Sequence, residues 1–294
     1  MDGRRRLTGR VRQAARRLLR VELQGAIDAA EDDRRPRGER IHDVRTALKR
    51  ARALLRLVSS LLGRRGREER RRLAAIARQF GAVRDAEVAV ETIDRLLPLL
   101  GGQSSALSAL RIRAVAEWRA LERRAETAQD LRRASRALAL ARRRAERLFD
   151  RARGQGGRAV ADGFVREYGK ARQAMKDADR LHTPLAFHVW RKGVKIHAYH
   201  VKVLTNAGVK EMASRRDSLD ALGSLLGEGH DLTVFEATIR AEQPRLGHSV
   251  DCERLLAVIE TRQRDIHRRV KQLGRRLFVD RPSMMRRKLR PRPL

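Results

Sequence analysis

Residues 41–58 read IHDVRTALKRARALLRLV, and this stretch determines how the rest of the chain is interpreted. It carries a histidine, an arginine and a lysine at spacings of three and four: His42, Arg45 and Lys49. Residues 187–204, FHVWRKGVKIHAYHVKVL, repeat these three residue types at the same spacings 146 positions later: His188, Arg191 and Lys195. The chain is therefore predicted to present the same polar triad twice.

A second pattern follows each copy of the triad at the same offset. Gly81-x-x-x-Asp85 in the first half of the chain becomes Gly227-x-x-x-Asp231 in the second. Two separate spacings that share one offset indicate two tandem copies of one unit. Because there are only two long copies, the repeat is not a solenoid, and it predicts two helical bundles related by a pseudo-two-fold axis.

Placed on a helical wheel, residues 41–58 show two adjacent stripes. The apolar stripe must face the core: Val44, Leu48, Ala51, Leu55 and Val58. The basic stripe borders it, where a groove between helices would lie: His42, Arg45, Lys49, Arg52 and Arg56. The second copy has the same two stripes, with Trp190, Val194 and Val201 apolar and His188, Arg191, Lys195 and Lys202 basic. Like charges four residues apart destabilise a helix, so two such stripes in matching register favour a binding surface over a solvated face.

The aspartates of the second pattern have two interpretations. Asp85 and Asp231 each stand four residues after a glycine, at the expected start of a helix, where the helix dipole stabilises a carboxylate. The alternative is an organising role, in which each aspartate holds an arginine or histidine of the basic stripe in position. The sequence supports both interpretations equally.

The chain is predicted to be all-α, because apolar residues recur at spacings of three and four and strand-like alternation is absent. Helices are expected at residues 8–31, 41–62, 68–80, 84–97, 106–129, 131–151, 159–178, 184–206, 214–226, 231–242 and 250–278. Residues 154–157, GQGG, are the expected linker between repeat halves at about 8–152 and 158–278. Residues 1–280 form one helical domain, and residues 281–294 form a loose basic tail rich in Arg and Pro.

Composition restricts the classes of partner. The 294 residues include 69 Lys and Arg against 36 Asp and Glu, a formal net charge of +33. A charge of this size attracts polyanions such as nucleic acid, polyphosphate or an anionic surface. The single cysteine, Cys252, excludes an internal disulfide and a Cys-based zinc site, and it fits a reducing cytoplasm. No apolar segment reaches the length of a membrane span, so a cytoplasmic protein is expected.

Histidines gather in the second half of the chain, where His197 and His200 are spaced for metal binding on one helix face. Neighbouring Lys195 and Lys202 oppose a divalent cation, and no carboxylate lies at ligand spacing, so no metal is expected. Hydrogen bonding to phosphate is the favoured role. Such bonding would strengthen as imidazolium forms, so binding is expected to be stronger at pH 6 than at pH 8.

These residues resemble those of the CHAD family, the conserved histidine α-helical domain. The similar segments are residues 41–58, GAVRDAEV at 81–88, residues 187–204, LGEGHDLTVF at 226–235, and the closing LGRRLFVDRPSMMRRKLR. The resemblance implies two antiparallel helical bundles around a basic central groove. It also implies binding of inorganic polyphosphate and, in some members, association with polyphosphate granules.

The resemblance assigns binding roles residue by residue. It implies polyphosphate-binding roles for His42, Arg45, Lys49 and Arg52 in the first copy, and for His188, Arg191, Lys192 and Lys195 in the second. The chain departs from the family at Gly193, where a basic residue is usual, and this departure predicts a weaker second site. Many relatives carry an additional triphosphate-hydrolysing domain marked by alternating glutamates, and no such segment occurs in this sequence.

Three functions remain to be compared. Non-catalytic binding of polyphosphate ranks first, because it needs cations at repeated spacing and no aromatic platforms, and aromatic residues are only 3% of the chain. General nucleic-acid binding ranks second, since phosphate contacts dominate its affinity, although single-strand binders usually stack bases on aromatic side chains. Phosphotransfer ranks last, because the sequence has no Walker loop, no paired carboxylates and no nucleophile elbow. No cofactor is expected.

Overall fold

The computed structural model describes residues 2–100, 105–152, 159–246 and 250–289, and within these ranges the chain forms helices and no strand. The all-α prediction is thus confirmed. The α-helices are α1 (Asp2–Glu31), α2 (Arg37–Leu57), α3 (Ser59–Gln79), α4 (Gly81–Leu96), α5 (Ser105–Arg123), α6 (Ala125–Arg151), α7 (Ala159–Leu181), α8 (Pro184–Asn206), α9 (Arg216–Leu246), α10 (Val250–Leu277) and α11 (Pro282–Lys288). Two 3-10 helices, η1 (Leu97–Leu100) and η2 (Lys210–Arg215), complete the described structure.

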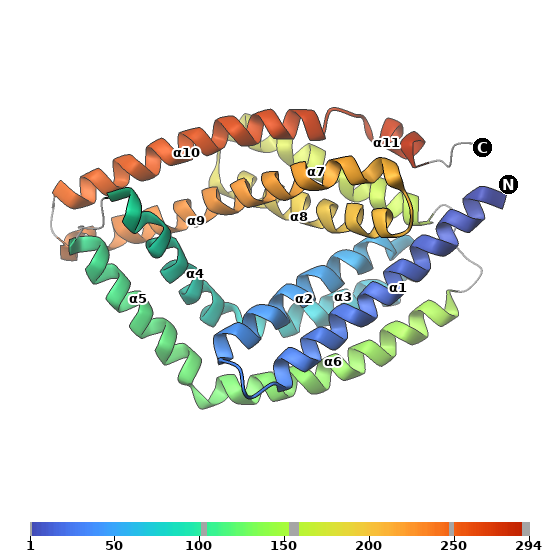
Figure 1. Ribbon diagram of the computed structural model, residues 1–294, viewed down its shortest axis with the longest axis horizontal. Helices are drawn as coiled ribbons and strands as arrows, with labels where there is room; N and C mark the ends of the chain where they lie inside the picture. Colours follow the sequence, from blue (N-terminus) through green and yellow to red (C-terminus); the bar gives the residue numbers. More distant parts are fainter. Residues whose placement is uncertain (1, 101–104, 153–158, 247–249, 290–294) are drawn as a thin grey trace.

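The helices pack in an order that follows the chain (Figure 1). In the first half, α1 packs on α2 and α6, and α3 also packs on both of these helices. In the second half, α7 packs on α8, α8 on α9, and α9 on α10. Helix α4 crosses between the halves, because it contacts α2, α5 and α9. The two copies of the polar triad therefore lie on α2 and α8, and the two Gly/Asp patterns on α4 and α9.

The apolar stripes of α2 and α8 are buried, as predicted. The stripe residues of α2 are each at most 1% exposed: Val44, Leu48, Ala51, Leu55 and Val58. Trp190, Val194 and Val201 on α8 are likewise buried. Burying an aliphatic side chain contributes about 1.5–3 kcal/mol, so these stripes decide which face of each helix turns inward. A search of the described helices for a segment able to span a bilayer found none.

Several predicted helix boundaries are wrong; the break expected near residue 130, for example, lies at Arg124. The helix expected at residues 41–62 ends at Leu57, because Val58 has φ −95° and ψ 14°, and Gly63 at φ 58° then kinks α3. A left-handed φ of this kind is readily adopted only by glycine, which explains why the bend occurs there. In the second half, the helices expected at 214–226 and 231–242 are one continuous helix, α9.

The segment after residue 280 is better ordered than predicted. Pro282 begins the short helix α11, and Met285 is completely buried against the core. Lys288 Nζ donates to Asp280 at 2.5 Å, and Arg286 pairs with Asp162 of α7. The expectation of a loose tail is therefore wrong for residues 282–289, because one apolar side chain and two ion pairs hold them. The expected linker at 154–157 and residues 290–294 lie outside the described residues.

Candidate functional site

Helices α2 and α8 meet where His200 contacts Ala53. The buried His200 donates from Nε2 to the carbonyl oxygen of Ala53 at 2.8 Å, so this imidazole ties the two repeat copies together. Lys49 lies one turn before Ala53 on α2, and Lys195 lies just over one turn before His200 on α8. The crossing thereby brings the two predicted basic stripes to the same region of the molecule.

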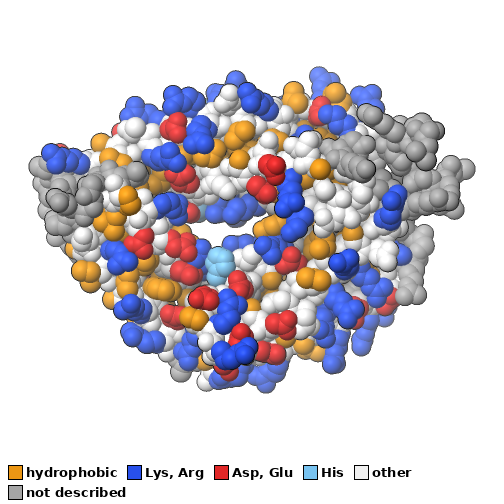
Figure 2. Space-filling model, viewed as in Figure 1, with side chains coloured by type: hydrophobic (Ala, Val, Ile, Leu, Met, Phe, Trp, Pro, Cys, Tyr) orange, Lys and Arg blue, Asp and Glu red, His pale blue; other side chains and the backbone are white. Residues whose placement is uncertain are grey.

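Lys49 is surrounded by positive charge from both halves of the chain. Desolvation, together with the charges of Arg45, Lys195, Arg191 and Arg84, lowers its pKa to about 8. The Lys49 side chain is nevertheless exposed to solvent. A side chain that is surrounded by protein and still reached by water is expected to line an opening. Figure 2 shows such an opening at the middle of the molecule, with Lys and Arg side chains and a histidine at its margin.

Arg45 is held in place by two neighbours. Its Nη1 donates to the carbonyl oxygen of Ala77 at 2.9 Å, near the C-terminus of α3, where free carbonyl groups favour a cation. Burial lowers the pKa of Arg45, and the charge of Asp85 on α4 acts in the opposite direction. The side chain is therefore fixed on one edge and partly desolvated.

The second copy has the corresponding arrangement. Burial lowers the pKa of Arg191, and the charge of Asp231 opposes that shift, as Asp85 does for Arg45. Gly227 lies beside the guanidinium, because a Cβ atom there would be in ordinary van der Waals contact with Arg191 Nε at 3.6 Å. Burial and the charge of Arg191 also lower the pKa of Lys195. Asp85 thus lies close enough to act on Arg45, and Asp231 close enough to act on Arg191, as the organising role requires.

The helix-dipole interpretation applies to only one of the aspartates. Asp85 is the fifth residue of α4, close to its N-terminus, but Asp231 lies in the middle of the continuous helix α9. The prediction that Asp231 begins a helix is wrong, since no break follows Gly227. Its position is accounted for instead by Arg191, His230 and Arg95, whose Nη2 lies 3.8 Å from the Asp231 carboxylate.

The C-terminal part of the α2 stripe forms a second basic cluster. Arg52 is partly buried, and burial and the charges of Arg56, Arg70 and Arg78 lower its pKa. Arg56 is neutralised by Glu167 of α7, with 3.3 Å between Nη1 and the carboxylate. Of the two predicted stripe residues here, Arg52 is thus free to meet an anion, and Arg56 is already paired.

Three other predicted residues lie around the edges of the site. Lys192 is exposed and close enough to His188 and His230 for its charge to lower the pKa of both. Lys202 is also exposed, and its charge acts on Glu22 of α1, away from Lys49. His42 is exposed on α2. The structure thus brings Arg45, Lys49, Arg191 and Lys195 together more closely than the remaining members of the two stripes.

A comparison with protein-family models matches the CHAD domain over residues 13–240. The chain belongs to the CHAD family. The matched range includes both polar triads and both Gly/Asp patterns, and it ends before α10 and α11. A search among curated proteins found no match.

Burial lowers the pKa values of His188 and His230 in the second copy. His188 packs against His230 with 4.5 Å between ring centroids, and burial together with Lys192, His230 and Arg191 lowers the pKa of His188 to about 4. The expectation that His188 gains charge near pH 6 is therefore wrong. His197 is wholly buried against Phe164, with 4.9 Å between the ring centroids, and His200 is buried as well. The two histidines at metal-binding spacing therefore pack in the core.

One residue of the CHAD site, Arg84, was missed by the sequence analysis, and His230 was considered only as one of the clustered histidines. Arg84 of α4 acts on Lys49, Lys195 and Arg45 through its charge, and it is itself paired with Glu87 at 2.7 Å. His230 occupies the same position in the second copy, one residue before Asp231. The signal was available, because both residues immediately precede the aspartate of the repeated pattern.

Gly193 lies against α7, and the weaker second site stays a prediction. A Cβ atom at this position would lie 3.0 Å from Ala171 Cα and 3.1 Å from Ala171 Cβ, so the residue faces α7. A long basic side chain would separate the two helices, and the glycine is explained by their close packing. A side chain at position 193 would therefore point towards Ala171 of α7.

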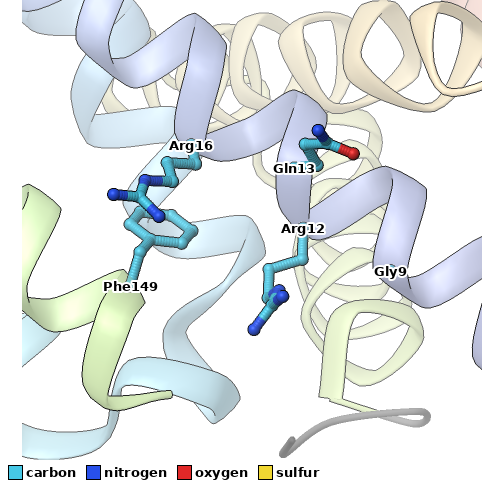
Figure 3. A pocket seen from close by; sticks show the side chains of 5 residues that line it. All are labelled: Gly9, Arg12, Gln13, Arg16 and Phe149. Carbon is cyan, nitrogen blue, oxygen red and sulfur yellow. The ribbon is translucent and has the colours of Figure 1, made fainter. Parts of the chain in front are cut away.

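A separate pocket of about 360 Å³ lies between α1 and α6 (Figure 3). Its lining residues are Gly9, Arg12, Gln13, Arg16 and Phe149. Both guanidinium groups already have partners. Arg16 pairs with Asp150 of α6 at 2.9 Å, and Arg12 donates to the carbonyl oxygen of Ala152, the residue after α6, at 3.4 Å. These contacts tie α1 to the end of α6, and the pocket is not a counterpart of the repeated stripes.

Proposed function

We propose that this CHAD domain binds inorganic polyphosphate without chemical turnover. The observation that carries the proposal is the convergence of Lys49 and Lys195, which belong to different halves of the chain. In addition to burial, the charge of Lys195 lowers the pKa of Lys49, and the charges of Arg191 and Arg84 lower the pKa values of both lysines. Gathering cations in a partly desolvated space costs free energy in the unliganded protein. A polyanion that neutralises several of them at once would offset this cost.

The arrangement also supports the finer prediction of two equivalent faces around a shared basic groove. Arg45 with Asp85 and Arg191 with Asp231 are matching pairs from the two copies, and each aspartate favours the charged form of its arginine. In our proposal the arginines donate paired hydrogen bonds to successive phosphates, and the lysines supply point charges between them. The aspartates position the arginines and do not contact the ligand.

Nucleic acid is the less favoured ligand because the aromatic side chains are used elsewhere. The largest fully buried aromatic residues pack in the core: Trp190, Tyr168, Phe80, Phe164 and Phe278. Single-strand binders gain about 1–3 kcal/mol per base from stacking on aromatic rings. Polyphosphate has no bases, so a site built from guanidinium and ammonium groups loses nothing by lacking such platforms.

A competition titration tests the proposed function. Labelled long-chain polyphosphate is bound to the purified protein at about 150 mM salt, where surface charges more than about 8 Å apart are screened. Single-stranded DNA or RNA is then added at equal and at excess phosphate concentration. Polyphosphate should stay bound in excess nucleic acid. Equal competition would instead indicate a general polyanion binder, and no binding of polyphosphate would refute the proposal.

The low pKa of Lys49 predicts a decline in affinity at alkaline pH. A bound polyanion stabilises the ammonium form, so the pKa of Lys49 must be higher in the complex than its value of about 8 in the free protein. Affinity should therefore be greatest below pH 8 and fall as pH rises through this value, because binding must then take up a proton. Titrations at constant ionic strength from about pH 6 to about pH 9.5 measure this decline in affinity. A lysine with the ordinary pKa near 10.4 stays mostly charged over this range, so it would not cause the decline.

The matched control replaces Lys49 and Lys195 with arginine. Arginine keeps its charge throughout this range, so the double variant should show a nearly flat profile. Burial and Arg191 also lower the pKa of Lys195, which is why both lysines are changed. A flat profile for the wild-type protein would show that neither lysine contacts the ligand, whereas a rise only below pH 6.5 would return the role to a histidine.

A further inference from the structure

The outer face of α6 carries a row of unpaired arginines. Its members are Arg132, Arg136, Arg143 and Arg147, and all four are exposed. Within the described residues, none of them forms an ion pair or a side-chain hydrogen bond. On a helical wheel they lie within an arc of about 60°, and the buried Leu138 and Ala145 lie on the opposite side of the helix. The row therefore points directly away from the core, over a length of about 22 Å.

The acidic residues in the C-terminal half of α6 face a different direction. Glu146 and Asp150 turn towards α1, where they pair with Arg20 at 3.8 Å and with Arg16 at 2.9 Å. Like charges four residues apart on one helix face destabilise the helix slightly, so folding alone gives no reason to gather arginines in this way. The row keeps its full charge, although the same helix contains acidic residues close by in sequence.

Helix α10 shows that such a row is not a general consequence of the basic composition. It runs along the opposite margin of the molecule from α6 (Figure 1). Its exposed Arg264 pairs with Glu260 at 3.9 Å, and its exposed Arg268 pairs with Asp265 at 2.8 Å. Charges of both signs therefore alternate on the outer face of α10, whereas the outer face of α6 has one sign.

An exposed leucine stands at the edge of the α6 row. Leu140 lies between Arg136 and Arg143 in the sequence, and 54% of its surface is exposed. A single exposed leucine is common on protein surfaces, but this one stands beside four unpaired arginines on the same side of a helix. Cations next to an exposed apolar side chain match the boundary of a lipid bilayer, where charged headgroups meet acyl chains.

The shape of the row favours a flat anionic surface over a nucleic-acid duplex. A straight helix that lies on a membrane brings all four arginines to the headgroups at once. The phosphates of a duplex curve away on either side of a groove about 12 Å wide, which is much shorter than the row of about 22 Å. Leu140 gains nothing from a phosphate backbone, whereas at a bilayer it enters the apolar region below the headgroups.

We propose that the outer face of α6 docks the protein on an anionic lipid bilayer, with the four arginines at the headgroups and Leu140 inserted between them. This surface is separate from the candidate polyphosphate site, because α6 packs on α1 and α3 while the two polar triads lie on α2 and α8. The inference goes beyond the proposed function and does not depend on it. One molecule can bind a membrane and a polyanion at the same time.

The test is sedimentation of the full-length protein with lipid vesicles at about 150 mM salt. One set of vesicles contains equal parts of phosphatidylcholine and phosphatidylserine, and the other contains phosphatidylcholine alone. The wild-type protein should bind the anionic vesicles and not the neutral ones. Arg136→Ala with Arg147→Ala should weaken binding about thirtyfold, since each basic residue near an anionic surface contributes about fivefold. Leu140→Gln keeps the charge and should weaken binding at least about fourfold, the effect of one buried methylene.

The matched control is Arg264→Ala with Arg268→Ala, which removes the same charge from the outer face of α10. It should weaken vesicle binding by no more than about threefold at this salt concentration. All of the altered side chains are exposed, so the variants should fold, and circular dichroism checks this. The variant of the α6 row should also keep the polyphosphate affinity of the wild-type protein, which separates this proposal from the proposed function.

Three results would overturn the proposal. Equal losses for the α6 and α10 double variants would mean that bulk charge holds the vesicles. Unchanged binding by Leu140→Gln would mean that no side chain of this face enters the bilayer. If the wild-type protein ignored anionic vesicles but bound duplex DNA, and the α6 variant lost that binding, the row would be a nucleic-acid surface. Each of these results leaves the measurement of polyphosphate binding to stand or fall by itself.

Discussion

Replacing Arg45 and Arg191 together with alanine is expected to weaken polyphosphate binding by at least about a hundredfold. A hydrogen bond to a charged partner contributes about 1.5–3 kcal/mol, and about 1.4 kcal/mol corresponds to a factor of ten in affinity. The Arg45 guanidinium is already held by Ala77 O at 2.9 Å, so its ordering cost is small, and both guanidinium groups are partly buried. Direct titration of labelled polyphosphate at constant salt measures the loss.

The matched control removes two positive charges that lie outside both polar triads. Arg142 and Arg143 lie on α6, which packs on α1 and α3 and not on α8. Their replacement with alanine changes the net charge by the same amount, and it should alter affinity by no more than about threefold at a salt concentration that screens distant charges. Equal losses for the two double variants would mean that affinity depends on bulk charge and that the repeated triads form no site.

Helical periodicity was sufficient to predict which faces of α2 and α8 turn inward. The spacing of Val44, Leu48 and Leu55 leaves only one apolar face, and burial of that face places Arg45 and Lys49 at its border. Periodicity did not predict that the helix expected at 41–62 ends at Leu57, because Val58, Leu61 and Leu62 continue the apolar spacing across the break. The end of α2 is set by its neighbour α7, whose Arg166 donates to the Arg56 carbonyl at 3.3 Å.

The candidate site was predictable only as far as local pattern determines it. Arg56 has the correct spacing for the basic stripe, but it is paired with Glu167, which lies 111 residues away in the chain. Arg84 stands on another helix, and only the fold brings its charge to Lys49. Pattern therefore identified the cations, and long-range packing decided which of them stay unpaired. The crossing of α2 and α8 brings Arg45, Arg191 and both lysines into one cluster.

The histidines show why residue type alone misjudges charge. At its ordinary pKa, His188 would gain a proton near pH 6, but its neighbours are His230, Lys192 and Arg191, and its ring is partly buried. Cations that gather to bind an anion also oppose protonation of any base among them. Desolvation and the same surrounding cations bring the pKa of Lys49 down to about 8, so a lysine in this cluster titrates well below its ordinary range.

Replacing Gly163 with alanine is expected to destabilise the whole fold strongly. Gly163 is on α7 where this helix crosses the end of α2, and an added Cβ atom would lie 1.8 Å from the carbonyl oxygen of Leu57. Backbone atoms cannot move aside as a flexible side chain can, so α7 and α2 must separate. Overpacking usually costs about 1–3 kcal/mol, and this contact belongs at or above the upper end of that range. Urea denaturation followed by circular dichroism measures the loss.

Gly25 provides the matched control for this change. It lies within α1, and an added Cβ atom there meets nothing within 4 Å. Gly25→Ala should therefore raise stability by about 0.5–1 kcal/mol, since alanine loses less conformational freedom than glycine in a helix. If Gly163→Ala also raised stability, α7 could not approach the end of α2 this closely. The junction between α7 and the end of α2 would then be looser than the structure shows.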